Sequence, residues 1–178
     1  MRLSIISLPM AIVAAFLLPL PHAKASTQVA FLEVMDGRGD RVQLEPDFPY
    51  AHMAIEIDGG WLHAHPASGA EWVPAGGLER YGRIARVLDV PSKMKVRTDL
   101  VDAFIGQPYD REFSWDNRAL YCSELVAKIL DIEPVPMVFD PRFWPADFAR
   151  LNGKPGISPG LVFRKISSEA YSHSAQRP

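Results

Sequence analysis

The chain is poor in cysteine and in net charge, and each scarcity excludes a class of protein. It has one cysteine, Cys122, which excludes a disulfide-stapled scaffold. The formal net charge is -2, with neither a basic field that would attract nucleic acid nor an acidic run that would form a solvating tail. Internal repeats are absent, and no low-complexity linker follows residue 26. The 178 residues therefore leave room for one globular domain of ordinary size.

The first 25 residues have the features of a signal peptide. Arg2 supplies a positive start, Leu3 to Leu20 carry no charge, and Ala23-Lys24-Ala25 places small residues at the two positions that a signal peptidase reads. The alternative is an uncleaved membrane anchor, because the apolar stretch is nearly long enough to span a bilayer. Two prolines just before the Ala-x-Ala ending favour cleavage. We therefore predict a periplasmic or secreted bacterial monomer that begins near Ser26, with no stable membrane span and no nucleic-acid partner.

A single cysteine is unusual for an exported protein, because oxidising surroundings favour cysteines in disulfide-bonded pairs. A lone thiol in that compartment is exposed to oxidation unless it is buried and inert or is kept for its reactivity. The cysteine count alone leaves Cys122 evenly divided between these two interpretations.

The distribution of turn-forming and apolar residues predicts an α+β fold. Sixteen prolines and twelve glycines indicate many turns rather than a helix bundle. Short apolar or alternating runs predict strands at 28–34, 53–57, 61–64, 84–90 and 161–166. Capping and stop signals predict helices at 98–104, from a cap at Asp116 or Asn117 to about Leu130, and at 145–151. We expect one domain over residues 26–166, followed by a flexible tail at 167–178.

The longest predicted helix carries the cysteine. Cys122 and Val126 fall on one stripe at helical spacing, so this stripe faces the core. A cap at Asp116 or Asn117 puts Cys122 within the first two turns. There the unpaired N–H groups and the positive end of the helix dipole favour a thiolate and lower the thiol pKa below its free value of about 8.5. The alternative is a cysteine that packs as a small hydrophobic residue.

A nucleophilic cysteine requires a base within hydrogen-bond reach. Three histidines surround the Asp58-Gly59-Gly60 turn, which joins the second and third predicted strands as a hairpin. A two-residue turn, which Asp-Gly favours, puts His63 and His65 on the same face as His52 and Glu56, whereas a three-residue loop sends them to opposite faces. We therefore expect the three histidines to share one face.

Three imidazoles on one face could instead bind zinc, with Glu56 or Cys122 completing the site. The chain lacks the His-x-x-x-His pair on a helix that is typical of many zinc sites. A third interpretation is that the histidines are structural. We predict no metal and no other cofactor.

Several segments resemble a family of papain-like hydrolases. His52-Met-Ala-Ile-Glu-Ile-Asp-Gly-Gly-Trp-Leu-His-Ala64 is similar to the histidine hairpin of the NlpC/P60 superfamily. Tyr121-Cys-Ser-Glu-Leu-Val126 is similar to the nucleophile helix of its circularly permuted branch, the YiiX/YebB-like and YaeF-like group, in which histidine precedes cysteine. Residues 39–40, 106–110 and 144–147 fit the same branch. The resemblance spans roughly residues 28–165 and implies a circularly permuted papain-like (NlpC/P60) fold, with an antiparallel sheet packed against the nucleophile helix.

Carried over by position, the resemblance implies that Cys122 is the nucleophile, His52 the base and His63 the third residue, which orients the base. The permuted branch often has glutamate at this third position, and His63 departs from that pattern. His65, Glu56 and Tyr109 are alternatives for the third member or for a substrate contact. Such a trio supports acyl transfer without a metal, and the backbone N–H of Cys122 is a natural oxyanion donor.

The function expected from these features is that of an exported cysteine hydrolase. It would be an amidase or peptidase that cleaves an amide bond in cell-envelope material such as peptidoglycan peptide. One alternative is a lipid acyl hydrolase or acyltransferase, since aromatic residues such as Trp61, Phe113 and Trp144 could line an apolar groove. Another is a non-catalytic binding module that kept the fold.

Overall fold

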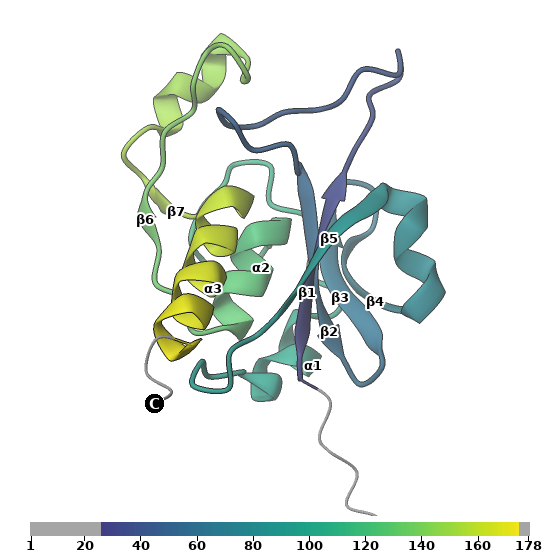
Figure 1. Cartoon of the computed structure of the whole chain (residues 1–178). Helices are drawn as coiled ribbons and strands as arrows, with labels where there is room; N and C mark the ends of the chain where they lie inside the picture. The colour runs from purple at the N-terminus through teal and green to yellow at the C-terminus, as the bar shows by residue number, and fades with distance from the viewer. Residues whose placement is uncertain (1–25, 175–178) are drawn as a thin grey trace, which may run out of the picture.

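A five-stranded antiparallel sheet forms the centre of the molecule, in the order β4-β3-β2-β1-β5. The computed structural model of the chain describes residues 26–174. Helices α2 and α3 lie on one side of the sheet, and the 3-10 helix η1 lies on the other (Figure 1). The elements in chain order are β1 (Gln28–Glu33), β2 (His52–Ile57), β3 (Gly60–His65), β4 (Gly69–Pro74), η1 (Ala75–Tyr81), β5 (Arg83–Asp89), η2 (Thr98–Leu100), α1 (Val101–Phe104), α2 (Cys122–Ile129), β6 (Val135–Pro136), η3 (Ala146–Leu151), β7 (Pro155–Gly156) and α3 (Pro159–Ser174).

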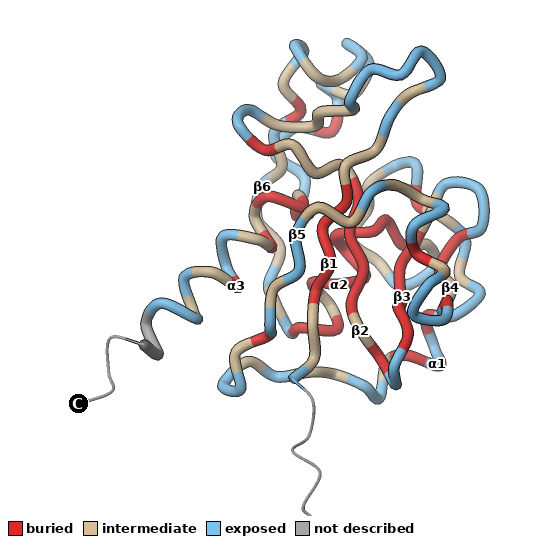
Figure 2. The backbone as a smooth tube through the Cα atoms, turned by 45° about the vertical axis from the view of Figure 1, so that its right-hand side comes forward, coloured by how far each residue is buried: buried red, intermediate tan, exposed pale blue. Residues whose placement is uncertain are grey.

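Side chains of the sheet alternate between two apolar layers. In the larger layer, Phe31, Met53, Ile55 and Leu62 of the sheet pack against α2, which contributes Leu125 and Ile129. The smaller layer packs against η1 and consists of Ala30, Leu32, Ala54, Trp61, Val73 and Leu78. Figure 2 shows the resulting burial along β1, β2 and β3. Because both faces are covered, the middle strands hold their side chains in fixed positions.

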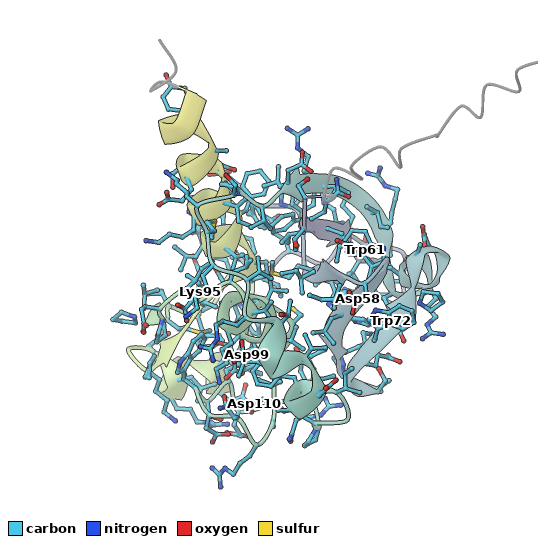
Figure 3. All side chains as sticks on the ribbon, turned by 90° about the horizontal axis from the view of Figure 1, so that it is seen from below. Asp58, Trp61, Trp72, Lys95, Asp99 and Asp110 are labelled. Carbon is cyan, nitrogen blue, oxygen red and sulfur yellow. The ribbon has the colours of Figure 1, made fainter. Side chains whose placement is uncertain are left out.

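The β2–β3 hairpin has the two-residue turn that its sequence predicts. Ile57 pairs with Gly60, and Asp58 and Gly59 have φ angles of 50° and 76°, as a type I′ turn requires. Trp72 of β4 donates its Nε1–H to the Ile57 carbonyl at 2.8 Å and lies near Asp58 (Figure 3). This register puts the three hairpin histidines on the η1 face of the sheet, so the expectation of a shared face is confirmed.

Helix α2 starts later than the sequence predicts. It begins at Cys122, and Tyr121 is its N-cap. Asp116 does not cap a helix but accepts the N–H of Arg118 at 2.8 Å, a local side-chain bond that competes with helix formation. The prediction of a helix from Asp116 or Asn117 is therefore wrong. The correction moves Cys122 from the second turn to the first helical residue.

The predicted last strand at 161–166 is also wrong, because these residues belong to helix α3. Ser158 accepts the N–H of Leu161 on its Oγ at 3.2 Å, and Pro159 occupies the first helical position. Both are standard features of a helix start. Val162 and Ile166 are buried at helical spacing. The helix continues to Ser174, through residues 167–174, where we expected a flexible tail.

The other predicted strands and helices agree with the structure, although some elements had no prediction. The strands at 28–34 and 84–90 and the helices at 98–104 and 145–151 correspond to β1, β5, η2 with α1, and η3. Strand β4 and helix η1 had no prediction. The predicted signal peptide, residues 1–25, lies outside the described residues. Within residues 26–174, no helix combines the length and apolar character needed to cross a membrane.

Candidate active site

Cys122 occupies the first residue of α2 and lies against the start of β2. Its side chain is 6% exposed. The sulfur accepts hydrogen bonds from backbone groups, among them Met53, the residue that follows His52. As a first-turn residue, Cys122 has a backbone N–H with no acceptor inside the helix. The helix start therefore presents both a thiol and an N–H donor beside the histidine strand.

His52 and His63 form a buried pair. The Nε2 atom of His52 lies 3.0 Å from Nδ1 of His63, a hydrogen bond between neighbouring strands. His52 is 5% exposed and His63 is fully buried. Because Nε2 of His52 is engaged by His63, its Nδ1 is the ring nitrogen left free to exchange a proton with a substrate or a thiol.

His65 lies on the same face but does not hydrogen-bond His52. Its ring centroid is 5.9 Å from that of His52 and 4.7 Å from that of Tyr81. Its Nδ1 accepts the N–H of Ala67 at 3.2 Å. His65 therefore lies at the edge of the histidine group, and His63 is the residue in position to orient His52.

The two other reserve candidates lie in different places. Glu56 accepts the N–H of Gly59 at 2.8 Å, so its carboxylate is used in the hairpin turn and not beside the histidines. Tyr109 lines the same pocket as Cys122. Burial raises the pKa of the Tyr109 phenol, and the nearby Cys122 raises it further. Tyr109 is thus a neutral hydroxyl next to the cysteine, suited to contact a substrate.

Two residues that the sequence analysis missed lie behind the histidines. Glu71 of β4 pairs directly with His63 across the β3–β4 ladder, with an Oε1 to Nε2 distance of 3.7 Å. Tyr81, the last residue of η1, donates its hydroxyl to Glu71 and contacts His63 edge to face, with ring centroids 4.4 Å apart. Neither could be placed without β4 and η1, the elements that had no prediction.

Burial favours the neutral forms of both Cys122 and His52 at neutral pH. It lowers the pKa of His52 well below 6.5, and the neighbouring His63 and His65 lower it further. It raises the pKa of the Cys122 thiol to about 11, against backbone hydrogen bonds that favour the thiolate. The expectation of a lowered thiol pKa is therefore wrong, because loss of solvent outweighs the helix start.

Buried polar groups fix the start of α2. Glu124, with a fully buried side chain, contacts Lys128 Nζ at 2.7 Å and accepts the N–H of Tyr121 at 3.4 Å. Burial raises the pKa of Glu124 to about 7, although Lys128 opposes the shift. Ser123 donates its hydroxyl to the Ile157 carbonyl at 2.8 Å. These bonds tie the residues after Cys122 to the helix and to the segment that precedes α3.

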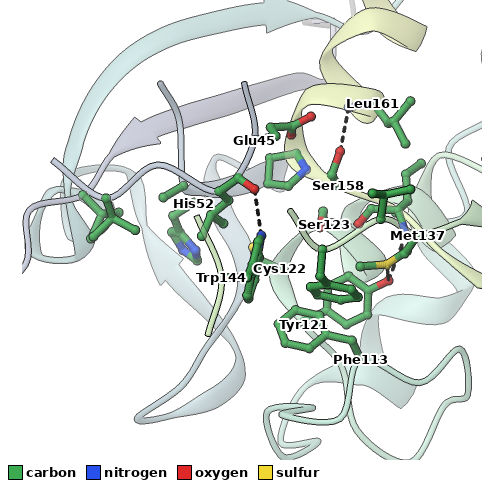
Figure 4. Close-up of a pocket in the computed structure, with 18 of the residues that line it drawn as sticks. Glu45, His52, Phe113, Tyr121, Cys122, Ser123, Met137, Trp144, Ser158 and Leu161 are labelled. Carbon is green, nitrogen blue, oxygen red and sulfur yellow. Dashed lines mark hydrogen bonds between the residues drawn. The ribbon is translucent and has the colours of Figure 1, made fainter. Parts of the chain in front are cut away.

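A pocket of about 550 Å³ opens at Cys122 and His52, a size typical of small-molecule sites. Figure 4 shows both residues facing it, with Tyr121, Phe113 and Trp144 beside them. Its remaining walls come from residues 34–46, from residues 136–140 and from the start of α3. Most of the lining side chains are apolar, and the charged ones include Glu45, Asp140 and Arg164. The pocket therefore offers an apolar cavity that ends at a thiol and an imidazole.

The histidine group does not fit a metal ion. Two imidazole nitrogens that share a zinc ion each lie about 2.0–2.1 Å from it on separate lone pairs. Here Nε2 of His52 and Nδ1 of His63 point at each other at hydrogen-bond distance. Among the described residues, no group of three or more His, Cys, Asp or Glu side chains is arranged to hold a metal. No catalytic step is therefore assigned to one.

A cysteine at a helix start and a histidine hydrogen-bonded to a third polar residue line one pocket, which is similar to the arrangement in papain-like cysteine hydrolases. Comparison with known proteins agrees with this class. Residues 70–139 match the family described as "Permuted papain-like amidase enzyme, YaeF/YiiX, C92 family". The matched segment contains Cys122 and Tyr109 but not His52 or His63. The resemblance to the permuted YiiX and YaeF branch is thus confirmed and, at the level of the family, supports a cysteine hydrolase.

A solved structure supports the same fold. The chain is similar to "metalloprotein yiiX from Escherichia coli O157:H7, DUF1105", with a TM-score of 0.55 and 18% sequence identity. The alignment covers 78% of this chain and 91% of the other. No curated protein sequence matches at a significant level. At this identity the likeness extends to the fold and not to the ligands of the relative.

Proposed function

We propose that the chain is a cysteine amidase in which Cys122 is the nucleophile, His52 the general base and His63 the residue that orients it. The observation that carries this proposal is the 3.0 Å His52–His63 pair at the pocket that Cys122 also lines. The pair leaves Nδ1 of His52 as the free proton acceptor of the ring. The description of the matched family as an amidase supports the choice of an amide bond.

The reaction follows from the neutral resting pair. As the Cys122 sulfur attacks the substrate carbonyl carbon, the thiol proton passes to Nδ1 of His52 and the carbonyl π electrons move to oxygen. The backbone N–H of Cys122 donates to that oxyanion. Collapse of the tetrahedral intermediate breaks the C–N bond, and the amine leaves with the proton from His52. Water, deprotonated by the same nitrogen, then hydrolyses the thioester and restores the thiol.

The proposed substrate is an amide of the cell envelope, such as peptidoglycan peptide. This choice rests on the signal-like residues 1–25, which would export the chain, and on the amidase family. The apolar pocket supports a second candidate, acyl chemistry on a lipid, because its walls suit an aliphatic chain better than a charged peptide. Both candidates use the same three residues and form the same kind of thioester.

A substrate panel distinguishes the candidates. The purified chain would be incubated with muropeptides, with N-acyl amides and with phospholipid esters, and the released products identified by mass spectrometry. Release of an amine from muropeptides supports the envelope amidase, and release from a lipid ester supports the acyl hydrolase. Cys122→Ala should abolish either activity, while Glu169→Gln, on the far end of α3, should leave it unchanged. No turnover of any substrate by the wild-type chain would favour a binding module and overturn the proposal.

A further inference from the structure

One nitrogen of the histidine pair is buried without a hydrogen-bond partner. The side chain of His63 is completely buried, and its Nδ1 is engaged by His52. Its Nε2 makes no hydrogen bond. A buried polar atom without a partner is costly, so its surroundings need an explanation. The group in front of Nε2 is the carboxylate of Glu71, with Oε1 at 3.7 Å.

The surroundings of Glu71 keep this carboxylate ionised. Burial alone would raise its pKa, but hydrogen bonds from the hydroxyls of Ser68 and Tyr81, with the charges of His63 and Arg80, bring the pKa below its ordinary value. Both hydroxyls donate to Oε1, the oxygen that faces His63. Arg80 lies 3.4 Å from the other oxygen. An ionised carboxylate accepts hydrogen bonds and cannot donate them, so it fixes which neighbours carry protons.

The acceptor oxygen that Glu71 places in front of His63 determines where the protons of the histidine pair lie. A neutral imidazole carries one N–H, and a carboxylate in front of Nε2 of His63 favours the N–H at that atom. Nδ1 of His63 is then an acceptor, so Nε2 of His52 must be the donor across the 3.0 Å bond. His52 is left with an unprotonated Nδ1. That is the state a general base requires.

We propose that Glu71 is a positioning residue that acts through His63 to hold His52 in its base-competent tautomer. The inference rests on the proposed function, since it assigns a use to the tautomer of His52. The negative charge of Glu71 also favours a protonated histidine: burial lowers the pKa of His63, and the Coulombic interaction with Glu71 raises it. When His52 takes the thiol proton, the same charge stabilises the imidazolium. The 3.7 Å separation between Glu71 and His63 is too long for a hydrogen bond in the free chain, and catalytic contacts of this kind often shorten when the substrate is bound.

Other groups around His63 do not supply this charge. His52 faces it from β2, His65 from β3 and the Tyr81 ring from η1, and none of these is an anion at neutral pH. Arg80 is a cation and lowers the pKa of His63. Among the described residues that contact His63, Glu71 from β4 is therefore the one that presents an anionic acceptor to Nε2 and so favours the Nε2–H form.

The tautomer can be measured without a substrate. The chain would be labelled with ¹⁵N-histidine, and the imidazole ¹⁵N shifts read at pH 7, where His63, with a pKa of about 4, is neutral. The His63 signals are identified by their loss in His63→Ala. In the wild type we expect the Nε2–H tautomer of His63, and in Glu71→Ala a mixture of both tautomers. Wild-type shifts that persist in Glu71→Ala would overturn the inference.

A conservative variant separates positioning from structural support. In Glu71→Gln, the donors Ser68 and Tyr81 keep the amide oxygen at the Oε1 position, so an acceptor still faces His63 while the charge is lost. We expect Glu71→Gln to keep the Nε2–H tautomer. A tautomer mixture in this variant, as in Glu71→Ala, would contradict the role of the acceptor at Oε1. Because the glutamine retains the contacts to Tyr81, its result does not depend on whether the alanine variant folds.

Kinetics supply the second readout once a substrate is known. Glu71→Ala should lower kcat by about tenfold to a hundredfold and change KM by less than about twofold. The substitution weakens the general base but leaves the walls of the substrate pocket unchanged. Glu71→Gln should recover part of kcat. Glu169→Gln, which removes an ion-paired carboxylate on α3, is the matched control. A rise in KM with constant kcat would contradict a positioning role.

The two proposals fail in different ways. If the wild-type chain turns over no substrate but Glu71 still sets the tautomer of His63, the proposed function is wrong and the assignment of Glu71 to the histidine pair stands. If turnover requires Cys122 and His52 but Glu71→Ala keeps both the tautomer and kcat, the inference about Glu71 is wrong and the proposed function stands.

Discussion

The protonation state of Cys122 gives a direct test of the site's electrostatics. Burial raises the pKa of the thiol to about 11. A free cysteine has a pKa of about 8.5, so at neutral pH the thiolate fraction of Cys122 is about 300-fold lower than that of a free thiol, from the difference of about 2.5 in pKa. Because the thiolate is the species that alkylating reagents attack, iodoacetamide should label the folded protein about 300-fold more slowly than an exposed thiol.

The assay follows the rate of alkylation from pH 6 to 10 by intact mass. The same chain unfolded in urea is the reference, because its single cysteine then has an ordinary pKa. Restricted access to a buried sulfur also slows labelling, so the pH dependence is the deciding quantity. We expect the native rate to rise about tenfold per pH unit up to about pH 10 and to be within about twofold in His52→Ala.

A different outcome would identify a thiolate–imidazolium pair. In that case the native rate reaches a plateau below pH 7, and His52→Ala removes the plateau, because the imidazolium is what stabilises the thiolate. Such a result would refute the neutral resting pair and the reasoning that burial outweighs the helix start. It would leave the identity of the nucleophile unchanged.

Three further outcomes are expected. As the pH is lowered, kcat/KM should decrease only with an apparent pKa below 6.5, because burial lowers the pKa of His52 and only the neutral imidazole accepts a proton. A decrease with an apparent pKa of 6.5 or higher would contradict this. His63→Ala should lower kcat by about a hundredfold and His65→Ala much less, whereas the reverse order would assign the orienting role to His65. Burial raises the pKa of Glu124 from 4.5 to about 7, so the folded state holds its proton more tightly than the unfolded state. As the pH rises from 4.5 to 7, the unfolding free energy of the wild type should therefore fall by about 3 kcal/mol relative to that of Glu124→Gln. A difference between the two proteins that stays constant with pH in denaturant titrations would contradict this shift.

The sequence predicts those parts of the fold that local patterns determine. The strands of the hairpin are visible because their residues are apolar or β-branched, and Asp58-Gly59 is a turn whose two positive φ angles few other dipeptides adopt. Strand β4 was missed because Gly69 and Pro74, at its two ends, are residues typical of turns. Helix α3 was predicted as a strand because Leu161, Val162 and Phe163 favour strands, and the Ser158-Pro159 helix start was overlooked.

The candidate site divides in the same way. The register of the hairpin is local, so the shared face of His52 and His63 could be predicted from the turn alone. The position of Glu71 depends on the β3–β4 pairing, and that of Tyr81 on the path of η1, neither of which has a local signal. The pKa of Cys122 depends on how much protein covers the sulfur. Helix position alone predicts a shift in the opposite direction, because it reports the dipole and not the loss of water.

The central claim is that Cys122, activated by His52, forms a covalent bond with the substrate carbonyl. Its most direct test is the intact mass of the chain after incubation with cell-envelope extract and a rapid acid quench. We expect a thioester adduct that peptide mapping assigns to Cys122. Its mass identifies the acyl group, and it should be absent in His52→Ala. Hydrolysis of an envelope substrate that proceeds in Cys122→Ala, or without an adduct on Cys122 under single-turnover conditions, would contradict it.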